Sequence, residues 1–366
     1  MTKLLYITNQ ISNSGGLERV LSIKASFLAE KMGYEVHILT LNDRTENLFY
    51  DFSPKIIHHN LSISSNKIKY LFDYIKGIRE KVKLINPDII SVCDDGQKGF
   101  LIPKIIKKPC PMVYERHVSR VIVGSNTKSN LINKLQILTK NAIMDYGANA
   151  YDAFVVLTKS NVSEWKNQNV KVISNPLSFY PEESALLKNK KVIAVGKHCY
   201  QKGYDRLLKI WQIVIKKHPD WCLEIYGAPN KDHNLKELAN KLNIEKNVTF
   251  YKPEKNIKEK FMEASIHVLS SRYEGFGMVL IEAMSCGVPP ISFDCPCGPS
   301  DIITENKDGI LIKNGDVQEF SAALFKLIEN ENLRLEMGKQ AKTNVKRYLP
   351  ENIVKQWDEL FVSLIK

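Results

Sequence analysis

The sequence predicts an α/β protein made of two successive doubly wound units, each a parallel sheet flanked by helices. Its 366 residues exceed one typical domain, so two domains are expected. Short apolar runs alternate along the chain with longer segments of helical periodicity, which is typical of parallel sheets. A polar, proline-bearing stretch at residues 175–184 interrupts this alternation, which then starts again. The apolar fraction of 44% and the charged fraction of 25% are those of a globular protein.

The first unit is expected to span residues 1–180. The apolar run at its start is too short for a signal peptide and is instead interpreted as a first buried strand. Strands are expected at 3–8, 35–40, 88–92, 112–115, 153–157 and 171–174. Helices are expected at 17–31, 67–85, 130–149 and 160–166.

The second unit is expected to span residues 181–349, and a final amphipathic helix follows at 350–366 with its proline at the start. Strands are expected at 191–195, 221–226, 248–251, 266–269, 290–293 and 309–312. Helices are expected at 204–217, 234–242, 257–263, 277–285, 317–330 and 333–348. Ligands of such sheets bind beyond the carboxyl ends of the strands, so the site is expected there.

The net charge of +12 is concentrated in the first unit. Of the 52 Lys and Arg residues, 24 lie in residues 1–180, against 15 of the 40 Asp and Glu, so this half carries +9. Three explanations account for this excess: a surface that faces anionic lipid, a surface that binds nucleic acid, or an organism whose proteins are generally rich in lysine. Nothing resembles a nucleic-acid-binding module, so the first and third explanations are favoured. No stretch approaches the ~20 apolar residues of a membrane span, which predicts a cytoplasmic protein or one peripheral on the inner face of the plasma membrane.

The seven cysteines are scattered and odd in number, as reduced cysteines are. Cys295 and Cys297 are separated by one proline, which is the wrong spacing for a zinc knuckle, and no second Cys or His pair is near in the sequence. Asp94 and Asp95 follow an expected strand but do not form an Asp-x-Asp motif. We therefore expect no metal.

The most informative stretch is residues 271–290, SRYEGFGMVLIEAMSCGVPP. It places Glu274 at the end of a strand and Glu282 within the next helix, with Gly275 and Gly277 between them. Free N–H groups at a helix start favour an anion, and glycine lets main chain approach a ligand closely. Solvated glutamates are the structural alternative. Two carboxylates beside an anion-binding turn suit a ligand with hydroxyls and phosphate, such as a nucleotide sugar.

Two further turns follow strands of the expected sheets. In the second unit, Gly196 and Gly203 flank a loop that carries Lys197 and Lys202. Two ammonium groups there would stabilise a departing diphosphate, although loop lysines are commonly just solvated. In the first unit, the pair of glycines at 15 and 16 opens a helix and suits a phosphate, or is simply a surface loop. No Gly-x-Gly-x-x-Gly motif occurs here, which disfavours a nicotinamide-dependent oxidoreductase.

These motifs together resemble the signature of the family-four retaining glycosyltransferases. The likeness is strong over residues 191–315 and looser over residues 1–180. It rests on Glu-Gly-Phe-Gly with its following helix, on Gly-Gly-x-Glu-Arg-Val at 15–20, and on Gly-Lys with a short loop and Lys-Gly at 196–203. The resemblance implies the GT-B fold, with two facing Rossmann-like domains and a last helix that crosses over and packs on the N-terminal domain.

The resemblance also implies roles for individual residues. Glu282 would bind the ribose and Glu274 the transferred sugar. Lys197 and Lys202 would stabilise the leaving group, and Lys197 stands where the family commonly has Arg. His117 would lie at the cleft near the sugar and acceptor, and Arg116 would bind an anionic acceptor group. The residues expected to contact the nucleotide sugar through backbone or close approach are Gly15, Gly16, Gly196, Phe276, Gly277, Met278 and Val279.

The implied reaction transfers a hexosyl or N-acetylhexosaminyl unit from a nucleotide sugar, with retention of anomeric configuration. The donor expected first is a UDP-linked sugar. The implied acceptor is a glycan or a polyprenyl-diphosphate-linked acceptor in surface polysaccharide biosynthesis, and neither a cofactor nor a metal is expected. Tyr251-Lys-Pro253 stands where the family often has glycine, which leaves uridine and guanosine open. A GT-B nucleotide-sugar epimerase and a non-catalytic homologue that binds a partner remain alternatives.

Overall fold

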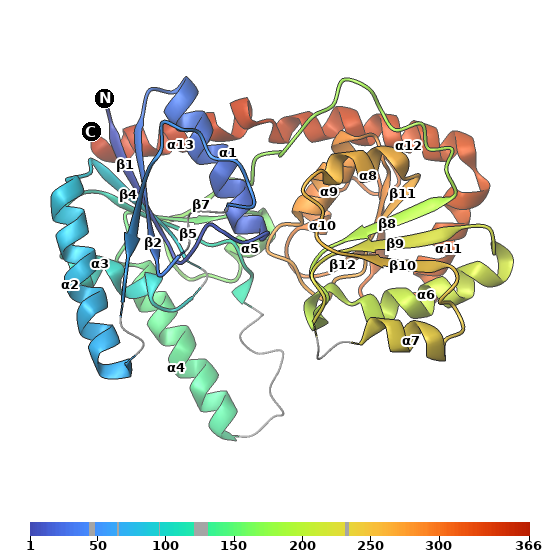
Figure 1. Ribbon diagram of the computed structural model, residues 1–366, viewed down its shortest axis with the longest axis horizontal. Coiled ribbons are helices and arrows are strands. Elements are labelled where there is room, and N and C mark those ends of the chain that lie inside the picture. The colour runs from blue at the N-terminus through green and yellow to red at the C-terminus, as the bar shows by residue number, and fades with distance from the viewer. Residues whose placement is uncertain (44–47, 64–65, 95, 121–130, 231–233) are drawn as a thin grey trace. The chain divides into compact units, whose positions relative to one another are not determined.

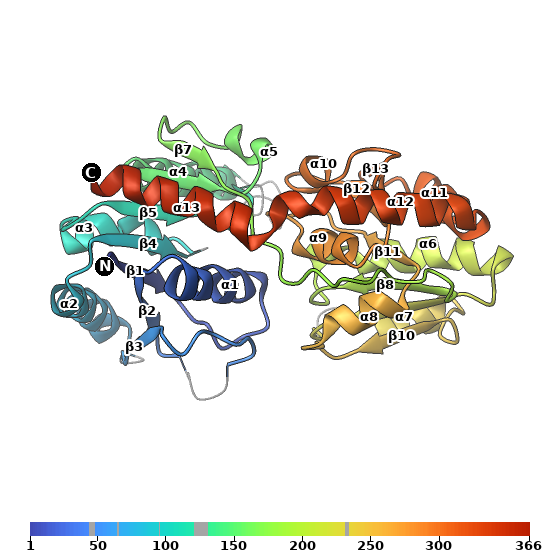
Figure 2. The same ribbon diagram turned by 90° about the horizontal axis from the view of Figure 1, so that it is seen from above.

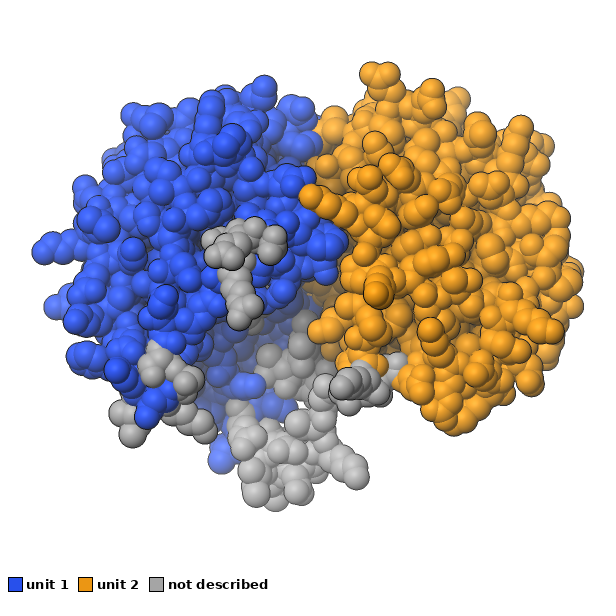
Figure 3. Space-filling view, viewed as in Figure 1, with its two compact units in different colours: residues 1–176, 350–366 blue, residues 177–349 orange. Residues whose placement is uncertain are grey.

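The computed structural model describes residues 1–43, 48–63, 66–94, 96–120, 131–230 and 234–366. The chain forms two compact units (Figure 3). Unit 1 consists of residues 1–176 together with 350–366, and unit 2 of residues 177–349. The change of unit lies at 176/177, a few residues before the expected boundary at 180/181, within the polar stretch that interrupts the alternation of strands and helices.

Unit 1 is a parallel seven-stranded sheet in the order β3-β2-β1-β4-β5-β6-β7 (Figure 1). Its strands are β1 (Lys3–Thr8), β2 (Glu35–Leu41), β3 (Ile57–Leu61), β4 (Ile89–Cys93), β5 (Met112–Glu115), β6 (Ala153–Val156) and β7 (Val170–Val172). Its helices are α1 (Gly16–Lys31), α2 (Lys67–Ile85), η1 (Gly99–Leu101), α3 (Ile102–Ile106), α4 (Leu131–Ala148), α5 (Lys159–Val162) and α13 (Pro350–Ile365).

The two faces of this sheet are covered by different helices, as Figures 1 and 2 show. Alternate strand residues such as Leu5, Val92 and Phe154 pack against α2, α3 and α4 in one buried cluster. Strand residues alternate between faces, so Leu4 and Tyr6, which are also fully buried, point to the opposite side. There α1 and α13 pack against each other. Both faces are therefore closed, as parallel sheets require.

The final helix α13 belongs to unit 1 although 173 residues of unit 2 precede it in the chain. Its Trp357 and Phe361 are buried, and the Tyr34 hydroxyl donates to Asp358 at 2.6 Å. The ring of Trp357 also lies 3.9 Å from the Lys24 ammonium of α1. The last helix therefore packs on the N-terminal unit, as the resemblance implied.

Unit 2 is a parallel six-stranded sheet in the order β10-β9-β8-β11-β12-β13. Its strands are β8 (Lys191–Val195), β9 (Cys222–Tyr226), β10 (Val248–Tyr251), β11 (Ile266–Leu269), β12 (Pro290–Asp294) and β13 (Ile310–Lys313). Its helices are η3 (Tyr200–Lys202), α6 (Tyr204–Lys217), α7 (Leu235–Lys241), α8 (Ile257–Glu263), α9 (Met278–Ser285), α10 (Pro299–Ile302), α11 (Val317–Glu329), α12 (Glu331–Asn344) and η4 (Val345–Tyr348).

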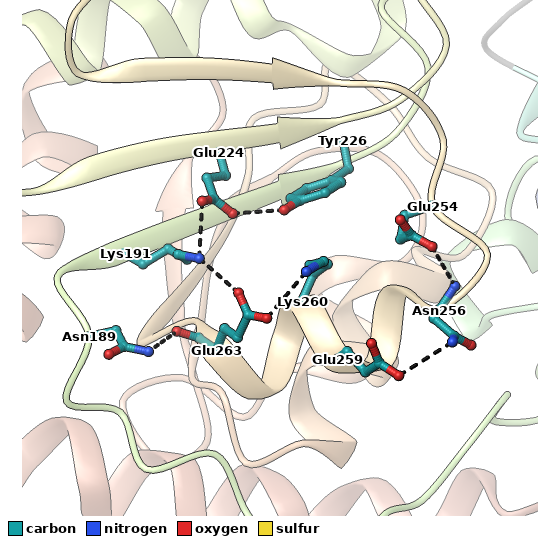
Figure 4. A network of polar contacts seen from close by, with 9 residues as sticks. All are labelled: Asn189, Lys191, Glu224, Tyr226, Glu254, Asn256, Glu259, Lys260 and Glu263. Atoms are coloured by element: carbon teal, nitrogen blue, oxygen red, sulfur yellow. Dashed lines mark hydrogen bonds and ion pairs between the residues drawn. The ribbon is translucent and has the colours of Figure 1, made fainter.

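A charged network joins the beginning of β8 to β9 and α8 (Figure 4). The Lys191 ammonium lies 3.0 Å from a carboxylate oxygen of Glu224 and 3.0 Å from one of Glu263. Burial opposes the charge on Lys191, but the hydrogen bonds that its ammonium donates to both carboxylates outweigh this and raise the pKa of that ammonium. The Tyr226 hydroxyl donates to the second oxygen of Glu224. This network fixes β8, whose other end opens into the site described below.

The α/β class and the two doubly wound units are confirmed. In the described part of the chain, the short elements that were not predicted are the edge strand β3, the helices α3 and α10, and the 3-10 helices η1 and η3. The predicted helix at 160–166 is shorter, at Lys159–Val162, and the predicted helix at 333–348 begins at Glu331 and ends in the 3-10 turn η4. Among the described residues, no helix is both long and apolar enough to cross a membrane.

Candidate functional site

In unit 2 the loop after β8 is tightly shaped by two glycines. Gly196 has φ +151° and Gly203 has φ +63°, a backbone conformation that side chains rarely adopt. Between them, η3 turns the chain back so that Lys202 lies beside Gly196, where an added Cβ would stand 2.8 Å from the Lys202 Cε atom. Lys197 is exposed and has no ion-pair partner among the residues that the structure describes. The two lysines of this loop therefore differ in their surroundings. Lys197 is exposed, whereas Lys202 lies against the loop beside Gly196.

Lys202 forms an ion pair with Glu274, whose Oε1 atom lies 2.8 Å from the ammonium nitrogen. The Ser271 hydroxyl donates to the same oxygen at 2.6 Å. Burial disfavours the charge of Lys202, but the neighbouring carboxylate more than offsets this and raises the pKa of the ammonium. The pair brings the two sequence-predicted motifs of unit 2 together at the carboxyl ends of β8 and β11.

Contacts that the sequence analysis did not identify hold these two loops together. The Arg272 guanidinium donates to both carboxylate oxygens of Asp205, at 2.8 and 2.7 Å. The Gln201 amide donates to the Tyr273 carbonyl, and the Arg272 N–H donates to the Gln201 carbonyl. A bidentate Arg–carboxylate pair has a defined geometry, so it fixes the angle at which the loops meet. Lys202 and Glu274 are positioned by these neighbours.

Gly227 is a further residue that the sequence analysis missed. It follows β9, and a Cβ there would stand 1.9 Å from the Gly196 carbonyl oxygen. The loop after β8 also donates two backbone hydrogen bonds to the end of β9 and the loop that follows, from Gly196 N–H to the Tyr226 carbonyl and from His198 N–H to the Ala228 carbonyl. Because the obstructing atom is backbone, only glycine allows this approach.

Gly227→Ala is therefore expected to push the loop at Gly196 away and to lower the free energy of unfolding by roughly 1–3 kcal/mol, the usual cost of overpacking. Urea unfolding of both proteins would measure this difference. Gly16→Ala is the matched control, because a Cβ at Gly16 would meet nothing within 4 Å. Equal stability of Gly227→Ala and the parent protein would contradict the close approach of the two loops.

The helix α9 begins at the glycine-rich turn after Glu274. Gly277 precedes the helix with φ +103° and supplies no capping side chain, and Met278 and Val279 are the first two helical residues. Phe276 is buried and packs edge-on against Tyr348, with ring centres 5.5 Å apart. The side chain of Phe276 is therefore part of the interior of unit 2, and any ligand contact at this turn would be made by the backbone.

Glu282 lies one turn into α9 and is 2% exposed, while Glu274 is 5% exposed. The Ser178 hydroxyl donates to the Oε1 atom of Glu282 at 2.7 Å. The alternative of two solvated glutamates is thus wrong. Carboxylates that are removed from solvent require polar partners, and such burial is more common at binding sites than on ordinary helix surfaces.

In unit 1 the turn at Gly15 and Gly16 opens α1 as expected. The carboxylate of Glu18 folds back over Gly15, where an added Cβ would stand 2.2 Å from the Oε2 atom. Glu18 itself is buried. An acidic side chain therefore lies beside the helix N-terminus at which a phosphate was expected, and such placement is favourable to the helix by itself.

Glu115 is the centre of a buried polar cluster in unit 1. Its carboxylate forms an ion pair with the Lys24 ammonium, accepts from the Ser91 hydroxyl at 2.5 Å, and lies 3.3 Å from the His117 Nε2 atom. Burial disfavours the charged carboxylate, but Lys24 and His117 outweigh it and hold the pKa of Glu115 well below its usual range. Of this cluster, only His117 was predicted from the sequence as a site residue, and neither Lys24 nor the partner role of Glu115 was.

Arg116 is 5% exposed, and its guanidinium lies 6.0 Å from the centre of the Phe100 ring. It therefore lies inside unit 1. Asp94 accepts from the Asn9 amide and from the backbone N–H groups of Gly96 and Gly99, so its oxygens cap a turn. The second aspartate of that pair, Asp95, lies outside the described residues.

One group of side chains in the described part of the chain has its ligand atoms close enough for a metal ion, namely Cys93, Glu115 and His117, within 4.8 Å of one another. The carboxylate of Glu115 already accepts from Lys24 and Ser91. A cation there would have to displace the ammonium, because the two positive charges would repel. The cluster suits an internal ion pair better than a metal.

Two Rossmann-like units in one chain are the architecture of the GT-B glycosyltransferases, which the sequence motifs resemble. The sequence comparison agrees: residues 179–344 match the family model described as glycosyl transferases group 1. The chain is also 32% identical over 374 residues to the amylovoran biosynthesis glycosyltransferase AmsD of Erwinia amylovora, and 30% identical over 362 residues to an uncharacterized glycosyltransferase of Haemophilus influenzae. Both alignments cover 98% of this chain and 99% of the relative.

This protein belongs to the group 1 glycosyltransferase family. Among solved structures, it is similar to that of Anabaena HepE in complex with UDP and glucose, with a TM-score of 0.78 and 17% identity over all of both chains. That likeness establishes the shared fold.

Proposed function

We propose that this glycosyltransferase transfers a hexosyl or N-acetylhexosaminyl unit from a UDP-linked donor, with retention of configuration, to a glycan or polyprenyl-diphosphate-linked acceptor of surface polysaccharide biosynthesis. The observation that carries the proposal is the ion pair of Lys202 and Glu274 beside the start of α9. The name of AmsD, an amylovoran biosynthesis glycosyltransferase, supports the choice of acceptor class. The complex of HepE with UDP and glucose supports a UDP-linked donor.

Each buried polar group of the unit 2 site would contact a particular part of the donor. Glu282 would accept hydrogen bonds from the ribose hydroxyls, and Glu274 would accept from hydroxyls of the transferred sugar. Backbone N–H groups of Gly277, Met278 and Val279 at the start of α9 would meet the diphosphate or the sugar. Gly196 allows a ligand to approach the loop closely, because it has no Cβ.

The chemical step would place negative charge on the leaving diphosphate, and Lys197 and Lys202 are suited to stabilise that charge. As the bond between the anomeric carbon and the diphosphate breaks, negative charge grows on the leaving oxygens. Lys202, fixed by Glu274, and Lys197 would stabilise that charge without a proton transfer. The acceptor hydroxyl would attack from the face that the diphosphate leaves, so that the diphosphate takes its proton and the configuration is retained. No metal is required for this arrangement.

In unit 1, the proposal assigns His117 to the sugar and acceptor side, with its imidazole oriented by Glu115. Gly15 and Gly16 would contact the diphosphate or acceptor through the backbone. Arg116 is the proposed contact for an anionic acceptor group, and its burial means that such a group would have to reach into unit 1.

Calorimetric titration tests the donor site directly. We expect UDP to bind without metal, binding to be unchanged by magnesium, and Glu282→Ala to weaken it by at least tenfold, since a hydrogen bond to a charged group contributes about 1.5–3 kcal/mol. Glu237→Ala is the control, because this carboxylate is exposed on helix α7 and pairs only with its own helix and cap in the contacts described. GDP should bind more weakly than UDP.

The other outcomes separate the alternatives. Preference for GDP would replace the donor with a GDP-linked sugar. Consumption of a UDP-sugar without any acceptor, with formation of its epimer, would indicate a nucleotide-sugar epimerase. Failure of the parent protein to bind either nucleotide would overturn the catalytic assignment and favour a non-catalytic binding protein.

A further inference from the structure

Helix α4 in unit 1 turns an apolar face toward solvent. A surface helix usually buries its apolar stripe and exposes charge. On α4 the exposed residues Leu135, Leu138 and Tyr146 are 66%, 65% and 62% exposed. Ala142 and Ile143 are exposed between them, which gives the helical spacing of one continuous stripe. Over these twelve residues the stripe is about 16 Å long at 1.5 Å per residue.

The polar residue within this stripe, Thr139, does not interrupt it. Its hydroxyl donates to the Leu135 carbonyl of the same helix at 2.9 Å. A threonine bonded in this way has no unsatisfied donor to present to its surroundings, and its methyl group remains on the surface. The exposed face of α4 is therefore compatible with a non-aqueous environment over the whole stripe. The opposite face of α4, with Met144 and Ala148, is buried against the sheet.

One basic residue of α3 borders the stripe, and another, on α2, joins α2 to α3. The Lys104 ammonium of α3 lies 5.5 Å from the centre of the Tyr146 ring, and the Arg79 guanidinium of α2 donates to the Ile105 carbonyl of α3 at 2.6 Å. The three helices thus form one layer on this side of the sheet. Residues 69–85 and 96–108 contain nine Lys and Arg but only two Asp and Glu.

The exposed side of α2 repeats the combination of apolar and basic groups. Phe72 is 69% exposed, and Lys76, Arg79 and Lys83 follow it at intervals that place them on the same side of the helix. The two ranges thus carry a net charge of +7, against +9 for residues 1–180 as a whole, on helices that also expose apolar side chains. An exposed apolar surface of this kind marks an interaction site.

We propose that the outer face of α2, α3 and α4 docks on the surface of an anionic lipid bilayer. The apolar stripe of α4 lies in the interface, and the basic residues of α2 and α3 contact the headgroups. The combination of aliphatic residues, an interfacial tyrosine and long basic side chains is what such a surface requires. The charge is complementary to that of anionic lipid. Docking needs neither donor nor acceptor, so it stands independently of the proposed transfer reaction.

Sedimentation of the full-length protein with vesicles tests the apolar part. We expect binding to phosphatidylcholine vesicles that contain phosphatidylglycerol, and little binding to phosphatidylcholine alone. Leu138→Glu should lower the partition coefficient about tenfold or more, since burying a leucine side chain contributes about 1.5–3 kcal/mol. Leu186→Glu, the same change at a 73% exposed leucine of unit 2, is the matched control and should bind as the parent does.

A charge reversal tests the basic part. Lys76→Glu combined with Lys83→Glu should weaken binding to the anionic vesicles about tenfold or more, because each basic residue near such a surface contributes about 1 kcal/mol. Lys236→Glu with Lys339→Glu makes the same net change on exposed lysines of unit 2 and should have a much smaller effect. Added salt should weaken the binding of the parent protein.

Three results would overturn the proposal: no binding to anionic vesicles, equal loss in the two charge-reversal variants, or unchanged binding of Leu138→Glu. If the parent protein does not bind vesicles but forms dimers, and Leu138→Glu dissociates these dimers, the face would instead bind a second copy of the chain. Circular dichroism of each variant verifies folding, and all the substituted side chains are exposed.

Discussion

Lys202→Ala is expected to lower the rate of sugar transfer by about 10²–10³, the usual effect of removing one donor that stabilises developing negative charge. The effect should fall mainly on kcat, because the charge that Lys202 meets grows as the diphosphate leaves. Lys202 is largely buried and fixed by Glu274, so no other ammonium of the described loop can take its place without rearrangement. Initial rates with a UDP-sugar and a lipid-linked or glycan acceptor measure this loss.

Lys190→Ala is the matched control. That lysine is exposed and pairs with Asp220 on the surface of unit 2, so transfer should be unchanged. Because Lys202→Ala also leaves Glu274 without its ammonium, UDP binding and thermal unfolding should be measured on the same samples. Near-normal transfer by a folded Lys202→Ala protein would remove this lysine from the chemical step.

Lys24→Met is expected to lower the free energy of unfolding by about 3–5 kcal/mol. It would leave the Glu115 carboxylate buried with a charge that no ammonium compensates, and breaking one side of a buried ion pair has a cost of this size. Chemical denaturation monitored by fluorescence measures the change. The double variant Lys24→Met with Glu115→Gln should regain a large part of the loss, because the unpaired charge is then gone.

The acid side of the stability curve provides a second readout. The folded pKa of Glu115 is lowered from its usual value of 4.5, so this group stabilises the fold above pH 4.5 and loses that contribution as pH falls toward the folded value. The difference between the parent protein and Lys24→Met should therefore shrink as pH is lowered. Lys190→Met, at an exposed pair, should change stability little at any pH, because solvent screens such a pair. A constant difference across this range would contradict the role of the pair.

The second unit was predicted more closely than the first because its local signals agree with one another. The expected strands at 191–195, 248–251 and 266–269 and the helices at 204–217 and 257–263 have the observed bounds. Each strand is a short apolar run before a glycine, proline or polar loop, and each helix has strong periodicity. The placement of lysine and glutamate loops at the carboxyl ends of parallel strands then follows from topology.

Elements that depend on distant partners could not be predicted in this way. The edge strand β3, Ile57-His-His-Asn-Leu61, has little apolar alternation, because it pairs on one side only and its middle is partly exposed. The ion pair of Lys24 with Glu115 joins residues 91 positions apart. Nothing in the pattern around Lys24, a charged residue within an amphipathic helix, indicates that α13 covers it with Trp357.

The position of α13 determines the order in which the two units can complete their folding during synthesis. Unit 2 is one continuous segment and can complete its fold as soon as residue 349 has left the ribosome. The N-terminal unit, although made first, must wait for residues 350–366 before Trp357 can cover Lys24. At ~5–20 residues per second, that interval is on the order of 10–35 s. The unit that is synthesised first is thus the last to complete its fold. In a nascent chain that stalls within unit 2, Lys24 of unit 1 is not yet covered by Trp357.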